Sequence, residues 1–351
     1  MSNITERAVA AIGRDNKGAD WQLRPKEHTE GLPPEADALK RVLESEELKR
    51  LITQFHEADA AAKKAQTNYK WIGNWGLGAA TIATIVGAVF LFPAESWLKD
   101  PVRTIVSVVQ VSFLVIAFCA ARWLAMKRPF NAWMQKRAQA EIARVDLFNR
   151  IVHADEVVQG DDIPLLPLKL EYFRRYQLDV QQRYYQVRGK QHEDRSWRNN
   201  GWLRLSSWIT GFVVVLGIFV VLEVLEGLGL ISPEWLVSVP ELLRAPQINR
   251  VMLAWGVIAS AFYGLGISLS LMDLDERNAS RYQTTAKNLE FLTNTNLAEA
   301  RVAAAVNDAQ TVYDFVAEIQ ALISSEHQEW ILLSAREHAL DPNKLRHAKP
   351  N

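Results

Sequence analysis

Two acidic side chains in an otherwise apolar run, Glu223 and Glu226, are the polar residues whose position most needs a chemical reason. They are three positions apart, so a helix places them on one face. A carboxylate at the centre of a bilayer costs about 2.5 to 3.5 kcal/mol. Counted from Trp202, Glu223 lies about 31 Å along such a helix, near the edge of a hydrocarbon layer. Two interpretations stay open: carboxylates at a helix end, or an acidic ring at the mouth of an oligomeric pore, which would favour cations.

Small residues recur at every fourth position in two other apolar runs. The spacing stacks them into one ridge along a helix, which lets a second backbone approach closely, and serine can hydrogen-bond across the contact. The ridges predict helix packing, within one chain or between copies, and make their members candidates for helix packing or pore lining: Gly76, Ala80 and Thr84 in the first run, and Gly256, Ser260, Gly264 and Ser268 in the second.

A lone amide, Gln110, lies in a further apolar run. An amide in hydrocarbon needs a hydrogen-bonding partner, so Gln110 is expected to face another helix or water. A contact between helices is favoured over a place in a pore lining, and both stay open.

No arrangement of residues typical of catalysis is found. The chain has neither a phosphate-binding G-x-x-x-x-G-K-[ST] loop nor a dinucleotide fingerprint. Neither Glu326-His327 nor Glu337-His338 forms an H-E-x-x-H zinc motif, and Cys119 has no polar base nearby in sequence. We therefore expect no enzyme activity, no cofactor and no metal site.

Aromatic and basic residues alternate around Tyr172, Tyr176, Arg183 and Tyr184. Such a pattern can stack single-stranded nucleic acid. The same stretch is rich in Glu, Asp and Gln, and the whole chain carries 40 basic and 40 acidic residues. A helix face in a soluble bundle is therefore the favoured interpretation, and no nucleic-acid partner is expected.

Four apolar runs are long enough to cross a hydrocarbon core of about 30 Å as helices. Trp71 and Trp75 stand at the start of the first run as interfacial anchors. Short loops join the runs in pairs, and charged helical segments flank each pair. The sequence predicts an all-α membrane protein with four transmembrane helices in two hairpins and a cytoplasmic helical bundle. The predicted spans are 71–92, 104–126, 202–228 and 251–272.

Basic residues near the span ends predict the orientation. They are dense beside the charged helices, for example at Lys70, Arg122, Arg128 and Arg198, whereas the two short loops carry only Lys99, Arg103, Arg244 and Arg250. Both termini and the charged helices are therefore expected in the cytoplasm. The first twenty residues contain no apolar signal-peptide core, so the first span is expected to direct insertion.

The order of these elements predicts two consecutive modules of the same plan: helix, span, loop, span, helix. The expected boundaries are a flexible N-terminal tail at 1–34, a first module at 35–160, a linker at 161–167, a second module at 168–340 and a C-terminal tail at 341–351.

Two short motifs, Tyr172-x3-Tyr176 and Asp179-x-x-Gln182-x-x-Tyr185, stand just before a two-span hairpin. They resemble the N-terminal helix of the SLATT family, the two-transmembrane effector domains associated with SMODS and SLOG proteins in bacterial conflict systems. The segment after the second hairpin is similar to their closing helix, and the first hairpin resembles a more divergent copy. The residues that carry the likeness to the closing helix are Tyr282, Leu289, Glu326, His327 and Trp330. Those that carry the likeness of the first hairpin are Ala140, Glu141 and Arg144.

The resemblance implies a membrane effector of a bacterial antiphage system. Such a protein would form or regulate a pore that permeabilises the inner membrane when a nucleotide-sensing partner, SLOG-like or belonging to a cyclase system, triggers it. It implies the lipid bilayer and other copies of the chain as further partners, and a multi-pass protein of the inner membrane. The alternative function is a non-conducting, membrane-anchored scaffold whose helical bundle docks a cytosolic partner.

Overall fold

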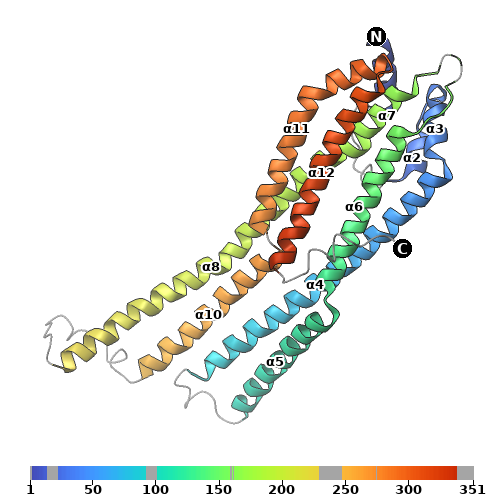
Figure 1. The fold of residues 1–351 in the computed structure, drawn as a ribbon. Coiled ribbons are helices and arrows are strands. Elements are labelled where there is room, and N and C mark those ends of the chain that lie inside the picture. Colours follow the sequence, from blue (N-terminus) through green and yellow to red (C-terminus); the bar gives the residue numbers. More distant parts are fainter. Residues whose placement is uncertain are drawn as a thin grey trace. The chain divides into compact units, whose positions relative to one another are not determined.

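The computed structural model describes residues 2–13, 23–91, 101–158, 160, 162–228, 247–273 and 275–337. Every regular element in these ranges is a helix (Figure 1). The chain divides into two compact units: unit 1 comprises Met1–Thr67, Pro129–His192 and Arg277–Asn351, and unit 2 comprises Asn68–Arg128 and Glu193–Glu276. Each unit draws on both halves of the chain, whereas the predicted modules follow one another along it.

Unit 1 is a helical bundle around a hydrophobic core. Its largest fully buried side chains include Phe148, Tyr172 and Phe173, and burying one side chain of this kind stabilises a fold by roughly 1.5 to 3 kcal/mol. Helix α7 packs against α1, α3, α6 and α12. The elements that contribute to this unit are α1 (Ser2–Ile12), α2 (Pro25–Glu30), η2 (Pro34–Ala36), α3 (Asp37–Leu43), the start of α4 (Glu46–Val89), α6 (Pro129–His153), α7 (Leu165–Phe173), η3 (Arg174–Leu178), the start of α8 (Asp179–Gly227), most of α11 (Asp275–Ala305) and α12 (Ala309–Glu337).

The N-terminal segment contains α1 and α2 in place of the flexible tail that the sequence predicts. Ala8 and Ile12 lie one helical turn apart and are fully buried, so α1 presents an apolar face to α7. Gly13 ends this helix in the left-handed conformation, with φ of 89° and its N–H bonded to the carbonyl of Val9. The predicted tail at 341–351 lies outside the described residues.

Unit 2 contains the parts of α4, α5 (Val102–Lys127), α8 and α10 (Gln247–Asp273) that carry the predicted spans. Among the described residues, four helices are long and apolar enough to cross a membrane. Ala120 is the one buried residue in α5, and Val108 and Phe118 are 59% and 67% exposed. The all-α fold and the four helices able to span a membrane are therefore confirmed.

Helix α4 runs without a break from residues of unit 1 into the first predicted span, as the absence of proline in it predicts. The helix that carries the second predicted span ends just before a proline. Arg128 caps α5 in the left-handed conformation with φ of 42°, and Pro129 opens α6. Proline disfavours the right-handed helical conformation in the residue before it, so α5 cannot continue past this point.

Candidate functional site in the apolar helices

The first ridge of small residues is used where α4 meets α5. A Cβ atom added at Gly76 would lie 2.9 Å from the Cβ of Ala120, closer than real side chains approach. Ala80 is half-buried, whereas Thr84 is exposed and turns its hydroxyl back to the carbonyl of Ala80 at 2.8 Å. The glycine thus permits close approach of two helices of the same chain, and Thr84 is left on the outside of that contact.

Gln110 lies against the same helix α4. A Cβ atom added at Gly87 would stand 2.5 Å from its amide nitrogen, so the absence of a side chain at Gly87 makes room for the amide. Gln110 is half-buried in this position. Within one chain it faces another helix, which is the alternative that the sequence favours.

Helices α8 and α10 pack through a different set of residues from the predicted ridge. The hydroxyl of Ser206, which is buried, donates a hydrogen bond of 2.9 Å to the carbonyl of Ala259. A Cβ atom at Gly266 would lie 2.9 Å from a methyl group of Leu203. The rings of Trp202 and Phe262 stack with centroids 5.5 Å apart. The face of α10 that carries Ala259 and Gly266 is therefore the one that contacts α8.

The ridge predicted on α10 stays largely open. A Cβ atom added at Gly256 or Gly264 would meet nothing within 4 Å. Ser260 between them is exposed, and its hydroxyl bonds to the carbonyl of Gly256 in its own helix at 2.9 Å, while Ser268 is half-buried. Two ridges with the same spacing are thus used differently: one makes an intrachain contact, and the other faces outwards.

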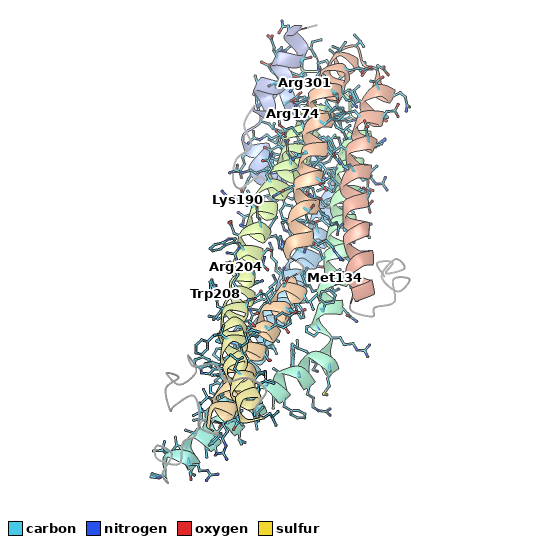
Figure 2. The ribbon with its side chains drawn as sticks, turned by 90° about the vertical axis from the view of Figure 1, so that its left-hand side faces the viewer. Met134, Arg174, Lys190, Arg204, Trp208 and Arg301 are labelled. Carbon is cyan, nitrogen blue, oxygen red and sulfur yellow. The ribbon has the colours of Figure 1, made fainter. Side chains whose placement is uncertain are left out.

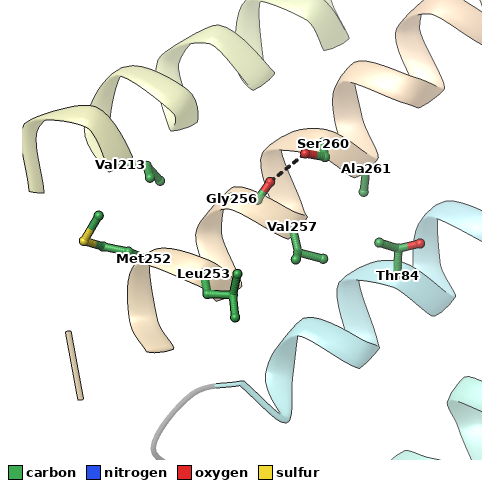
Figure 3. A pocket seen from close by; sticks show the side chains of 8 residues that line it. All are labelled: Thr84, Val213, Met252, Leu253, Gly256, Val257, Ser260 and Ala261. Carbon is green, nitrogen blue, oxygen red and sulfur yellow. Dashed lines mark hydrogen bonds between the residues drawn. The ribbon is translucent and has the colours of Figure 1, made fainter. Parts of the chain in front are cut away.

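An open hollow of about 740 Å³ lies over this ridge (Figure 3). Thr84 comes from α4, Val213 from α8, and the remaining lining residues from α10: Met252, Leu253, Gly256, Val257, Ser260 and Ala261. Both hydroxyls in the lining, those of Thr84 and Ser260, already bond to carbonyls of their own helices. The hollow therefore offers an apolar surface whose polar groups are satisfied.

Glu223 and Glu226 lie in the last turns of α8, which ends at Gly227, and their side chains lie outside the described residues. The side chains of Glu326, His327 and Trp330, which carry part of the predicted family resemblance, also lie outside the described residues.

Unit 1 contains a buried ionic cluster that sequence reasoning missed. Glu171 is 1% exposed and accepts hydrogen bonds of 2.6 Å from the Nε atoms of both Arg174 and Arg301. Arg174 also reaches Asp179 at 2.5 Å. The cluster joins α7 to α11 across 130 positions of sequence, and Figure 2 labels its two arginines.

The carboxyl of Asp179 is unusually easy to protonate. Its burial raises its pKa to about 6, and the negative charge of Glu171 acts in the same direction, while the positive charge of Arg174 only partly offsets this. Arg174 is shared between Asp179 and the more deeply buried Glu171, so its positive charge cannot fully stabilise both carboxylates. Asp179 therefore takes up a proton in the folded protein well above the pH at which an exposed aspartate does.

A π-helical turn, η3, sets the direction of two neighbouring arginines. Arg174 and Arg175 donate hydrogen bonds to the carbonyls of Gly13 and Ile12, which are unpaired C-terminal carbonyls of α1. A cation favours this position because it offsets the negative end of the helix dipole. π turns are rare and frequently mark functional positions, and this one anchors the N-terminal helix to α7 and α8.

Buried amides continue the polar core of unit 1. The guanidinium of Arg144 donates to Gln177, and Gln177 donates to Gln320 of α12 at 3.2 Å. No periodicity in the sequence marks these residues, because each replaces one apolar residue in a regular helical pattern. Tyr172 and Tyr176 are 1% and 6% exposed, so their rings are not accessible for stacking with bases.

No group of three or more His, Cys, Asp or Glu side chains that could hold a metal ion occurs among the described residues. Comparison of the chain with family models, with curated proteins and with solved structures finds no match. The geometry of the open α10 ridge and of the unit 1 core is therefore the basis for inferring function.

Proposed function

We propose that the protein is a multi-pass effector of the bacterial inner membrane that permeabilises it by assembling through the open ridge of α10. The single observation that carries this proposal is the empty space at Gly256 and Gly264. Apolar surroundings give apolar helices little reason to associate, so close backbone packing at small residues is the main way for them to do so. A ridge left open by its own chain is suited to the helix of another copy.

The hollow beside this ridge supports assembly further. Its lining combines small residues with two hydroxyls, and an entering helix would meet no large side chain at Gly256, Ser260 or Ala261. The hydroxyls of Thr84 and Ser260 can exchange their intrahelical partners for groups of a neighbouring helix or for water. Such a surface fits an oligomer in which these hydroxyls make the interior partly polar once the copies have assembled.

Unit 1 is the proposed receiver of the trigger. The distribution of basic residues predicts that it lies in the cytoplasm, and the likeness to SLATT domains suggests a nucleotide-sensing protein, SLOG-like or from a cyclase system, as its partner. Helices α4 and α8 each contribute residues to both units, so a change in unit 1 has a covalent route into two of the four apolar helices.

A leak assay tests the proposal. Purified full-length protein in dye-loaded vesicles, with the product of a neighbouring gene as trigger, should release dye, and Ser260→Leu with Gly264→Leu should reduce release at least tenfold. Ser112→Leu is the matched control, because Ser112 is also exposed and also bonds to the carbonyl four residues earlier in its own helix. Release by the double variant at the wild-type rate, with normal membrane insertion, contradicts assembly through α10.

The second candidate function is a membrane anchor for a docking bundle. The observation that favours it is that the hydroxyls in the hollow are satisfied within their own helices, as in a helix that merely faces lipid. A scaffold would bind its cytosolic partner, leave vesicles sealed, and tolerate the same double substitution.

A further inference from the structure

Contacts within unit 2 fix which residues of α8 and α10 lie at the same level. Leu203 meets Gly266, and Gly217 meets Met252, so the two helices are antiparallel and in register over fourteen residues. Extending this register by six residues places Trp197 at the level of Met272. Gly73 of α4 also meets Met272, so a third helix reaches the same level.

This level is the end of the uncharged part of α10. Residues 251–272 contain no charged side chain, and Asp273 follows directly. Arg204 lies seven residues beyond Trp197 along α8, which is about 10 Å deeper in the apolar layer at the rise of an α-helix. Its backbone is therefore level with a part of α10 that has no charge.

Within the described part of the chain, Arg204 has no acidic partner. Its guanidinium lies over the ring of Trp197, with 5.8 Å from Cζ to the ring centroid, and among the described residues it makes no ion pair or hydrogen bond. Helical side chains lean towards the helix N-terminus, which here leads from Arg204 back to Trp197 and out of the apolar layer. Trp197 is 66% exposed, and Trp208, one turn beyond Arg204, is 80% exposed. Figure 2 labels Arg204 and Trp208 on α8.

A guanidinium placed in this way needs an anion. Arginine that starts in hydrocarbon extends its side chain to the interface, and its planar donor groups match a phosphate with two parallel hydrogen bonds. Exposed tryptophans are typical of the same interfacial level. Over residues 193–204, Arg195, Arg198 and Arg204 stand against two carboxylates, those of Glu193 and Asp194. The single net positive charge favours a headgroup with net negative charge over a zwitterionic one.

We propose that Arg204 and Trp197 form a binding site for the phosphate group of an anionic phospholipid. This inference depends on the membrane placement in the proposed function, although not on pore formation. The lipid phosphate supplies the counter-ion that the described residues do not, and Trp208 borders the place of its acyl chains.

The test is lipid retention by the full-length protein. Protein reconstituted in nanodiscs of equal parts phosphatidylglycerol and phosphatidylcholine is transferred to detergent, and the retained lipids are counted by native mass spectrometry. We expect about fivefold enrichment of phosphatidylglycerol for the wild type. Arg204→Gln should abolish the enrichment, and Arg204→Lys should reduce it, because an ammonium lacks the planar donor pair.

Controls separate the possible results. Arg50→Gln removes a charge from unit 1 that is also exposed and should leave the enrichment unchanged. If Arg204→Gln does not fold, Trp197→Ala tests the site instead, because it changes only an exposed ring. We expect Trp197→Ala to lower the enrichment of phosphatidylglycerol. Equal retention of both lipids by the wild type, or unchanged enrichment in Arg204→Gln and Trp197→Ala, overturns the proposal.

Two further measurements identify the source of any failure. Inorganic phosphate at millimolar concentration should not displace the retained lipid, and displacement would assign the site to a soluble anion. Resistance of the wild type to alkaline extraction from membranes reports the membrane placement by itself. Extraction of the wild type would overturn the proposed function, whereas a resistant wild type without lipid enrichment would overturn only the lipid site.

Discussion

Units 1 and 2 place the same kinds of side chain in opposite surroundings. In unit 1 the ring of Phe148 has no exposed surface, and the buried carboxylate of Glu171 is paired with arginines. In unit 2 the large apolar side chains point outwards, as with Phe118, and a charge such as Arg204 has no acidic partner in the described part of the chain. The difference is the one expected between two solvents: unit 1 has the interior of a protein folded in water, and unit 2 has an apolar exterior that is compatible with lipid.

The largest expected effect comes from one substitution made in both units. Phe148→Ala removes a ring with no exposed surface and leaves a cavity, so it should lower the free energy of unfolding by about 3 to 5 kcal/mol. Phe118→Ala removes a ring that is 67% exposed and should cost under about 1 kcal/mol. Thermal unfolding in the same detergent measures both, and equal losses would contradict the contrast between the units.

The second prediction concerns pH and is specific to unit 1. The pKa of Asp179 is about 6 in the folded protein and 3.8 in an unfolded chain. Because the folded pKa is raised, the stability from this group is fully present below about pH 4 and is lost as pH rises through about 6. The change amounts to at most about 3 kcal/mol at 1.4 kcal/mol per pKa unit.

Asp179→Asn should remove this part of the pH dependence. The melting temperatures of wild type and variant, compared from pH 4 to 7.5, should diverge as pH rises through about 6. Asp146→Asn, at an exposed position of α6, is the control and should follow the wild type throughout. Parallel curves for Asp179→Asn and wild type would show that the carboxyl titrates normally.

Local signals predict the fold well, and long-range contacts limit what more the sequence can predict. A run of about twenty largely apolar residues can be recognised from the local sequence, so the four apolar helices follow from composition alone. The sequence predicts a flexible tail over residues 1–34, yet Gly13 ends α1 in a conformation that glycine adopts without strain. The bonds that dock this helix come from Arg174 and Arg175, more than 160 positions away. No local pattern encodes that pairing.

The candidate site shows the same limit within unit 2. Spacing of four identifies which residues share a helix face, but it does not identify what the face contacts. Gly76 and Gly256 belong to ridges of identical spacing, and only the first is filled by its own chain. Depth and partner depend on the register between helices, which side-chain contacts such as that of Leu203 with Gly266 reveal and the sequence does not.

The smallest expected effect compares two glycines of α10. At Gly266 a new Cβ atom would lie 2.9 Å from Leu203 and 3.3 Å from the Cβ of Trp202, so Gly266→Ala should destabilise the packing of α8 on α10 by about 1 to 3 kcal/mol. At Gly256 the new methyl group meets open space. Alanine also suits a helix better than glycine, so Gly256→Ala should be neutral or stabilise the monomer by up to about 1 kcal/mol.

Two readouts on this pair distinguish the contact made within one chain from the face proposed for a second copy. The free energy of unfolding of the detergent-solubilised monomer should fall only in Gly266→Ala. Crosslinking between copies in vesicles should weaken in Gly256→Ala, because the added methyl group occupies the place of an approaching backbone, and this loss should appear without any loss of monomer stability. Crosslinking between copies that stays intact in both Gly256→Ala and the bulkier Gly264→Leu would contradict the proposal. The open ridge would then face lipid, and the second copy would contact another surface.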